Sequence, residues 1–250
     1  MWTSSRRSRA AHPTRSRRVG VAVAVLACVG LAACTAAEPP SPASTTEADT
    51  VAPFPESGFL DAGTYLVTSY PVPFEITVPD GWRTYNGAEL GRDDPDLPNE
   101  WNAFLWFYPD PVTHVPTDAC AWKGALVEID STAEALVDAM TAQTSTQSTP
   151  AIEVMVGDYS GFEFDHTAES DVDFTDCDLG HLCIWAGSAE DCSEGKAYET
   201  LGERETYRVV DLSGERAVIS VSQSHESIDP ALIEEARAIF DSIEFVGPDE

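Results

Sequence analysis

Basic residues are scarce in this chain, and they are concentrated at its start. The 250 residues include 14 Lys and Arg against 43 Asp and Glu, a formal net charge of −29 at pH 7. Six of the 14 precede residue 19, so a chain that begins at residue 34 keeps 8 basic against 43 acidic residues, a charge of −35. Such a charge disfavours nucleic acid and anionic lipid headgroups and favours cations, divalent metals or basic partners. The alternative is that it serves solubility alone.

The sequence also lacks the patterns that assemble a catalytic site. The segment Gly157-Asp-Tyr-Ser160-Gly161 does not have the Gly-x-Ser-x-Gly spacing of a nucleophile elbow. It also joins two expected strands, where an elbow needs a strand followed by a helix. The five histidines show no metal-binding spacing such as His-Glu-x-x-His, and no glycine-rich phosphate loop occurs. We therefore expect no catalytic residues, no cofactor and no enzymatic activity.

A long hydrophobic run is missing too. The apolar run 19–33 is at the short end of the ~20 residues that a membrane-spanning helix needs. It follows a basic segment and ends in Leu31-Ala32-Ala33-Cys34, which has the form of a lipobox. We expect 1–33 to be a lipoprotein signal peptide and Cys34 to carry the lipid, with palmitate among its acyl chains.

The exported protein is then expected at the outer face of the cell membrane, anchored through Cys34. The alternative is a single uncleaved N-terminal membrane-spanning helix. The export route stays open, because Ser16-Arg17-Arg18 matches only part of a twin-arginine signal. Residues 34–56 are rich in Pro, Ser and Thr with few large apolar residues, which predicts a disordered tether. Residues 57–250 are expected to form a single extracytoplasmic domain.

Four cysteines follow the tether. An even number in an exported domain predicts two disulfide bonds. Four cysteines allow three pairings, and sequence alone does not choose among them. A zinc site is the alternative, but the last three cysteines are separated by five and eight residues instead of the two to four typical of zinc ligands. We predict that Cys120 pairs with Cys177 and that Cys183 pairs with Cys192.

The rest of the chain shows strand and helix patterns. Phe74–Val78 alternates apolar and polar residues, which is typical of a half-buried strand. A capping box at Ser131 and Glu134 and an Asp229-Pro230 cap predict two helix starts. Helices are expected at 132–143 and 230–243, and strands at 63–68, 74–78, 103–108, 122–129, 151–156, 160–167, 205–212 and 217–224.

Two segments carry a family resemblance. Phe74-Glu-Ile-Thr-Val-Pro-Asp-Gly-Trp82, and a terminal helix that closes on Ile239-Phe-Asp-Ser-Ile-Glu-Phe245, resemble the start and end of PsbP/Mog1-like domains. Actinobacterial secreted lipoproteins of the LpqN type are similar in plan. The resemblance spans most of 58–246 and implies an α+β fold, a curved antiparallel sheet with two main helices packed on it. It implies binding or accessory modules and no catalytic residues.

Two residue groups are candidates for ligand binding. Alternating acidic residues near His166 and His181 could supply the oxygen ligands that calcium prefers, although the EF-hand pattern fails. A solvated loop pinned by Cys177 and Cys183 is the alternative. A set of aromatic residues could line an apolar pocket if one sheet face is uncovered, or could simply pack within the sheet. The acidic candidates are Asp171, Asp173, Asp176 and Asp178, and the aromatic candidates are Trp101, Trp106 and Tyr108.

We therefore expect a lipid-anchored extracytoplasmic binding or accessory module. The alternatives are a protein–protein interaction component of the cell envelope and an acidic-loop cation-binding protein. The expected partners are the membrane, through the lipid on Cys34, and either an envelope protein or a small ligand. No nucleic acid is expected. A concave aromatic pocket would favour a small ligand, whereas an exposed apolar surface would favour a protein partner.

Overall fold

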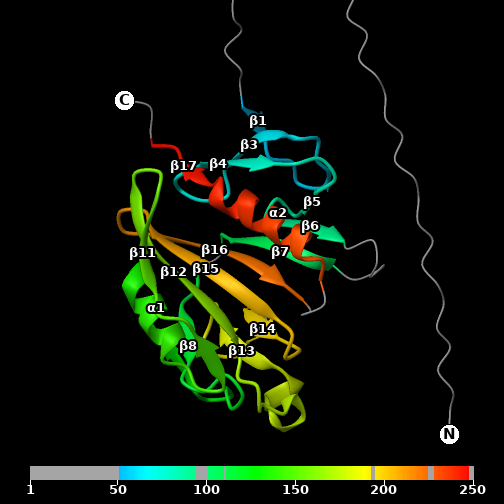
Figure 1. The fold of residues 1–250 in the computed structure, drawn as a ribbon. Helices are drawn as coiled ribbons and strands as arrows, with labels where there is room; N and C mark the ends of the chain where they lie inside the picture. Colours follow the sequence, from blue (N-terminus) through cyan, green and yellow to red (C-terminus); the bar gives the residue numbers. More distant parts are fainter. Residues whose placement is uncertain (1–50, 94–100, 110, 193–194, 225–227, 248–250) are drawn as a thin grey trace, which may run out of the picture. The chain divides into compact units, whose positions relative to one another are not determined.

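The computed structural model describes residues 51–93, 101–109, 111–192, 195–224 and 228–247 (Figure 1). They belong to one compact unit that runs from Glu47 to Glu250. The expected signal peptide, Cys34 and most of the expected tether lie outside the described residues, as does the side chain of Trp101. Within the described part of the chain, no helix is long and apolar enough to cross a membrane.

A nine-stranded sheet forms the centre of this unit. Its strands follow the order β10-β12-β15-β16-β7-β6-β5-β2, and β11 also pairs with β12. All of its pairings are antiparallel. The strands are β2 (Gly58–Phe59), β5 (Arg83–Tyr85), β6 (Glu89–Asp93), β7 (Trp101–Tyr108), β10 (Thr146–Ser148), β11 (Ile152–Val156), β12 (Tyr159–Ala168), β15 (Arg204–Asp211) and β16 (Arg216–Gln223).

Both faces of the central sheet are buried. Successive residues of β15 and β16 belong to different hydrophobic cores: Val209 packs in one and Val210 in the other. Side chains alternate across a strand, so these cores lie on opposite faces. One face is covered by α2 (Pro230–Asp241) and by a second sheet of β1 (Ala52–Pro53), β3 (Gly63–Val67), β4 (Phe74–Val78) and β17 (Glu244–Phe245).

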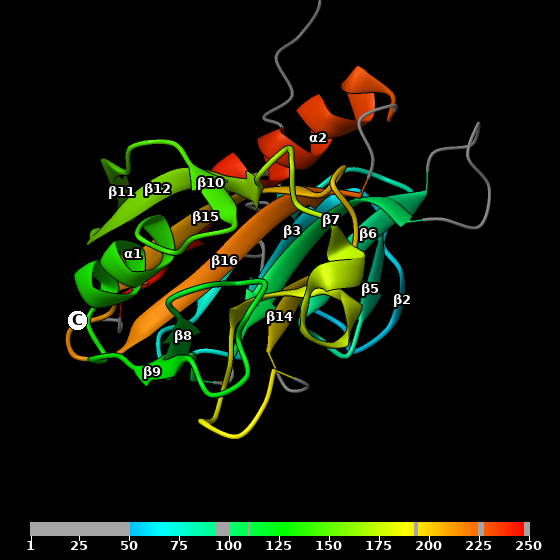
Figure 2. The same ribbon diagram turned by 90° about the horizontal axis from the view of Figure 1, so that it is seen from below.

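The opposite face is covered by α1 and by two small sheets, as the view in Figure 2 makes visible. α1 places Ala133, Leu136, Val137 and Met140 in this core. The covering elements are α1 (Ala133–Thr141), the pair β8 (His114–Pro116) and β9 (Leu126–Glu128), and the pair β13 (Leu182–Trp185) and β14 (Lys196–Tyr198).

The α+β fold expected from the sequence, two main helices packed on a curved antiparallel sheet in the PsbP/Mog1-like manner, is wrong. Strands account for 44% and helices for 15% of the described residues, and the strands form several sheets. Helices of 9 and 12 residues cannot cover both faces of a nine-stranded sheet. Short strands that the sequence pattern did not reveal supply the remaining cover and the outer strands, among them β5, β6, β8, β13 and β14.

Both helices begin close to the expected residues. Asp229 caps α2 and Pro230 is its first residue, as predicted. The cap of α1 is Thr132 instead of Ser131: its hydroxyl accepts a hydrogen bond from the amide of Ala135 at 3.1 Å. The expected strand 122–129 is reduced to β9, because Trp122 is buried in a turn where its indole N–H donates to the carbonyl of Asp178 at 3.2 Å.

Two disulfide bonds fasten the segment that follows β12. They join Cys120 to Cys177 and Cys183 to Cys192, the two predicted pairs. The segment 168–200, expected to be a long loop, contains two short 3₁₀ helices (Phe174–Asp176 and Asp178–Gly180) and the hairpin β13–β14. The first disulfide joins this strand-containing insertion to the loop between β8 and β9, and the second lies within the insertion.

Candidate functional site

β11 is an edge strand of the central sheet. Along one side it pairs with β12 over its full length, from Ile152 opposite Glu163 to Val156 opposite Tyr159. No other described strand pairs with it, and no described backbone hydrogen bond joins it to another segment. Figures 1 and 2 both place it at the margin of the sheet. Outward-facing amide and carbonyl groups of an edge strand are open to pairing with a further strand.

The side chains of β11 do not protect this edge. Ile152 is 57% exposed and Met155 is 66% exposed. Proteins usually guard a sheet edge with charged residues, proline, bulges or a covering segment. Here Glu153 is the only charged residue in Ile-Glu-Val-Met-Val, a run with strong β propensity. An exposed apolar edge of this kind is either an aggregation hazard or a binding surface.

An open cleft of about 630 Å³ lies on one side of β11. We call it the first cleft. The start of α1, the strands β11 and β12, and the last residue of β15 line it. Glu153 and Met155 of β11 stand opposite Phe162 and Ser160 of β12, and all four residues line this cleft.

Carboxylates dominate the charge of the first cleft. Glu134, Glu153 and Asp211 line it, and no Lys or Arg is among its lining residues. Arg216 stands opposite Asp211 in the sheet, but its guanidinium donates to the carbonyls of Asp130 and Thr132 at 2.6 and 2.8 Å. Arg216 therefore fixes the chain that leads into α1, and with it one lip of the cleft.

A second cleft of about 560 Å³ lies on the other side of β11. We call it the second cleft. Val154 and Val156 of β11 meet Ile243 and Glu244 there. Val156 is only 2% exposed, and Asp241 and Ser242 also line this cleft, so polar groups make up much of its open surface.

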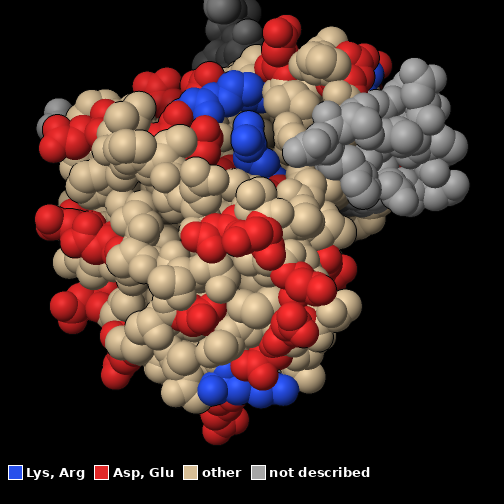
Figure 3. Space-filling model, turned by 60° about the horizontal axis from the view of Figure 1, so that its bottom comes forward, with Lys and Arg blue, Asp and Glu red and all other residues tan. Residues whose placement is uncertain are grey.

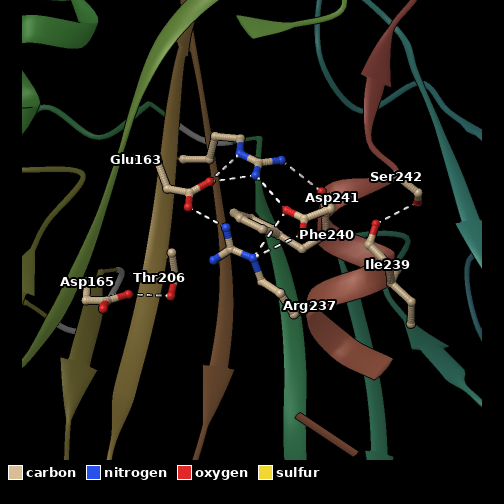
Figure 4. A network of polar contacts seen from close by, with 9 residues as sticks. Glu163, Asp165, Thr206, Arg237, Ile239, Phe240, Asp241 and Ser242 are labelled. Atoms are coloured by element: carbon tan, nitrogen blue, oxygen red, sulfur yellow. Dashed lines mark hydrogen bonds and ion pairs between the residues drawn. The ribbon is translucent and has the colours of Figure 1, made fainter. Parts of the chain in front are cut away.

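A fixed ion-pair network forms part of the second cleft's wall (Figure 4). Arg208 lies 2.6 Å from a carboxylate oxygen of Glu163 and 2.9 Å from one of Asp241. The other oxygen of Glu163 pairs with Arg237 of α2. Arg208 also donates to the carbonyl of Phe240 at 2.9 Å. The network ties α2 to β12 and β15 and leaves the Arg208 charge neutralised.

The turn between β11 and β12 is locked by a glycine. Gly157 has a φ of +61°, a conformation that disfavours other residues. A Cβ at this position would lie 2.7 Å from the carbonyl oxygen of Phe245 in β17. The hairpin therefore packs directly on the C-terminal strand, so the position of β11 is set at its C-terminal end.

Acidic side chains outnumber basic ones on the surface that Figure 3 draws. Figure 3 shows one face, with acidic side chains spread among neutral ones and few basic ones. Seven of the eight basic residues that follow residue 33 contact acidic, aromatic or backbone groups of the chain itself. They are Arg83, Arg92, Lys123, Lys196, Arg208, Arg216 and Arg237.

In the acidic loop expected to hold a cation, two carboxylates accept hydrogen bonds from other groups of the chain. Asp173 accepts hydrogen bonds from the amide and hydroxyl of Thr175, which lowers the pKa of its carboxyl. Asp178 accepts from the amide of Lys123 at 2.8 Å. Among the described residues, no group of three or more His, Cys, Asp and Glu is placed to hold a metal ion. Asp171, Asp173, Asp176 and Asp178 therefore do not converge on a common point.

The aromatic candidates pack instead of lining one pocket together. The rings of Trp106 and Tyr108 stack with centroids 6.1 Å apart. Trp185 of β13 packs edge-on against Tyr108, and the ammonium group of Lys196 lies 5.3 Å from the ring of Trp106. The disulfide-bonded insertion thus covers these rings, although Tyr108 also reaches a separate open cleft beside Tyr70. Trp101 is not comparable, because its side chain lies outside the described residues.

A buried polar cluster lies beneath the same insertion. Glu205 is 1% exposed, pairs with Lys196 at 3.0 Å, and accepts from the hydroxyls of Tyr198 and Tyr207. Burial and the nearby Glu205 raise the pKa of both tyrosines. His166 is fully buried, and burial lowers its pKa to about 4. These groups fasten β14 to the sheet, and their burial keeps them from contact with a ligand.

Comparison with known proteins adds no assignment: no protein-family model and no curated protein matches this chain. A function must therefore be inferred from β11 and its two clefts. The sequence predicted 151–156 as a strand, but nothing in the pattern placed that strand at the sheet edge. In the sequence, Ile152 and Met155 look like ordinary strand residues. Their exposure becomes evident only from the structure, in which β11 pairs with β12 alone.

Proposed function

We propose that this protein is a non-catalytic binding module of the cell envelope that captures an extended segment of a partner protein by strand addition to β11. In this proposal the lipid on Cys34 holds the module at the outer face of the cell membrane. The observation that supports the binding mode is the free edge of β11 between two clefts. The proposal favours a protein partner over a small ligand.

Strand addition would use the unpaired main-chain groups of β11 and the two clefts beside it. Main-chain hydrogen bonds to an edge strand supply affinity, and pockets for alternate side chains supply specificity. The five residues of β11 offer about 17 Å of edge, enough for an incoming strand of ordinary length. The first cleft and the second cleft lie on the two faces of this edge, where the alternate side chains of an added strand would point.

The aromatic residues do not favour a small-molecule site. Trp106 and Tyr108 are partly covered by Lys196 and Trp185. By contrast, Ile152 and Met155 are both more than half exposed. Exposed apolar residues on an unpaired strand are typical of a surface that a macromolecule covers.

Selection of random twelve-residue peptides displayed on phage tests the proposal, with the purified protein as target. We expect enriched peptides that bind with micromolar affinity. The double variant Ile152→Thr/Met155→Thr should weaken that binding about tenfold, a loss of ~1.4 kcal/mol, while the fold is retained because both side chains are exposed. Val127→Thr/Leu201→Thr is the matched control, since these residues are also exposed but lie elsewhere. Equal binding by both double variants, or no enrichment, would refute the proposal.

A further inference from the structure

The pairing register decides where the side chains of an added strand would point. Residues directly opposite each other on neighbouring strands share a face of the sheet. Residues opposite Glu153 and Met155 would therefore point toward the first cleft, and residues opposite Ile152, Val154 and Val156 toward the second cleft. The two clefts would read alternate positions of one extended peptide.

The first cleft has the charge to select among peptides. Glu134, Glu153 and Asp211 line it, each on an exposed position and each from a different element. The N-terminus of α1 opposes them with roughly half a positive charge, which three carboxylates outweigh. The amides of the first helical turn can also donate hydrogen bonds to a peptide carbonyl.

The second cleft has a different chemistry. Arg208 is neutralised by Glu163 and Asp241, so it has no charge to offer an acidic side chain. Val156 and Ile243 are only 2% and 4% exposed, so they offer little surface to a peptide. Polar groups of Asp241, Ser242 and Glu244 line much of the rest, so the selection for charge lies in the first cleft.

We infer that the segment added to β11 belongs to a partner protein and carries Lys or Arg at alternate positions, with these side chains entering the first cleft. This inference rests on the proposed strand addition and adds the chemistry of the partner. The juxtaposition that carries it is an unpaired apolar edge flanked by three carboxylates without a basic residue among the cleft's lining residues.

A second copy of this chain is a poorer occupant. In an antiparallel β11–β11 pair centred on Val154, each Glu153 would face Met155 of the other copy and enter a cleft that already holds Glu134 and Asp211. The two copies would also bring together chains of strong like charge. Charge complementarity favours a basic segment on another protein.

Three eight-residue peptides test the inference. All have valine at every second position, with lysine, glutamine or glutamate between the valines. At 150 mM salt we expect the lysine peptide to bind at least tenfold more tightly than the glutamine peptide, and the glutamate peptide not to bind. Glu153→Gln and Glu134→Gln should each weaken the lysine peptide about threefold and leave the glutamine peptide unchanged, whereas the exposed Glu128→Gln on β9 should change neither.

Two measurements show where the peptide binds: amide exchange, and affinity for the double variant Ile152→Thr/Met155→Thr. This variant changes no charge and is called the neutral variant. Equal affinity of the lysine and glutamine peptides, with slowed exchange in β11, would overturn the basic preference and keep strand addition. Lysine-peptide binding without slowed exchange in β11, or binding that the neutral variant leaves unchanged, would overturn both. A dimer in sedimentation that this variant dissociates would also overturn the inference, because β11 would then be occupied by a second copy.

Discussion

Glu163 on β12 binds Arg208 on β15 at 2.6 Å, and its other oxygen pairs with Arg237 on α2. The carboxylate is the hub that holds α2 against the sheet and fixes the wall of the second cleft (Figure 4). Glu163 and Arg208 are only 11% and 9% exposed in their side chains, so solvent does little to screen the pair.

Removal of this carboxylate should be strongly destabilising. Glu163→Ala leaves Arg208 buried without its main partner, and we expect a loss of ~3 kcal/mol in the free energy of unfolding. Glu153→Ala on the neighbouring strand removes an exposed carboxylate and should change stability by less than ~0.5 kcal/mol. Urea denaturation of both variants measures the difference. A loss below ~1 kcal/mol for Glu163→Ala would mean that other contacts hold α2.

Gly157→Ala should be more damaging than a glycine replacement at an open turn. Both Gly157 (φ +61°) and Gly124 (φ +77°) have positive φ, but only Gly157 has a backbone oxygen 2.7 Å from the position of a Cβ. We expect Gly124→Ala to lower stability by ~1 kcal/mol through strain alone. Gly157→Ala should lower it by at least ~2 kcal/mol, because the hairpin must also move away from β17. Equal losses in thermal unfolding would contradict the packing of this turn.

Acid should weaken the fold through His166. Its pKa is lowered from 6.5 to about 4 by burial, so the folded state binds fewer protons than the unfolded state between these values. The stability from neutral His166 is complete above pH ~6.5 and is lost as the pH falls to about 4, by up to ~3 kcal/mol. His166→Phe should remove this component from the pH profile. Superimposable profile shapes for the two proteins would contradict it.

Cys34→Ala tests the anchor. Cys34 is the residue expected to carry the lipid, so its loss should abolish palmitate incorporation, and the protein should be either released from the membrane fraction or retained with its signal uncleaved. The measurement is N-terminal mass analysis of the fractionated protein. Wild-type protein that carries an intact N-terminus, with membrane association unchanged in the variant, would indicate a spanning helix instead.

Local patterns predicted much of the secondary structure. The alternation in Phe74–Val78 and the Asp229-Pro230 cap act within a few residues, and β4 and α2 form where they were expected. The fold class failed because it depends on short strands such as β5 and β8, whose three residues show no period of their own. Such strands form because a partner strand is available, and no local pattern carries that information.

The candidate site could not be predicted from local sequence patterns, for a related reason. Ile152 and Met155 look like the residues of any half-buried strand, and only the pairing of β11 on one side exposes them. Trp106 and Tyr108 show the reverse, since aromatic residues that could line a pocket are covered by an insertion. In the first cleft, Glu134, Glu153 and Asp211 come from three separate elements, so their proximity arises only in the folded chain.

Amide hydrogen–deuterium exchange across the described strands, with and without a peptide selected on the protein, tests the central claim most directly. Strand addition predicts that the amides of Ile152–Val156 exchange at least tenfold more slowly in the complex, while those of β16 at the sheet centre stay unchanged. Slowed exchange confined to another part of the chain, with β11 unaffected by bound peptide, would contradict the account.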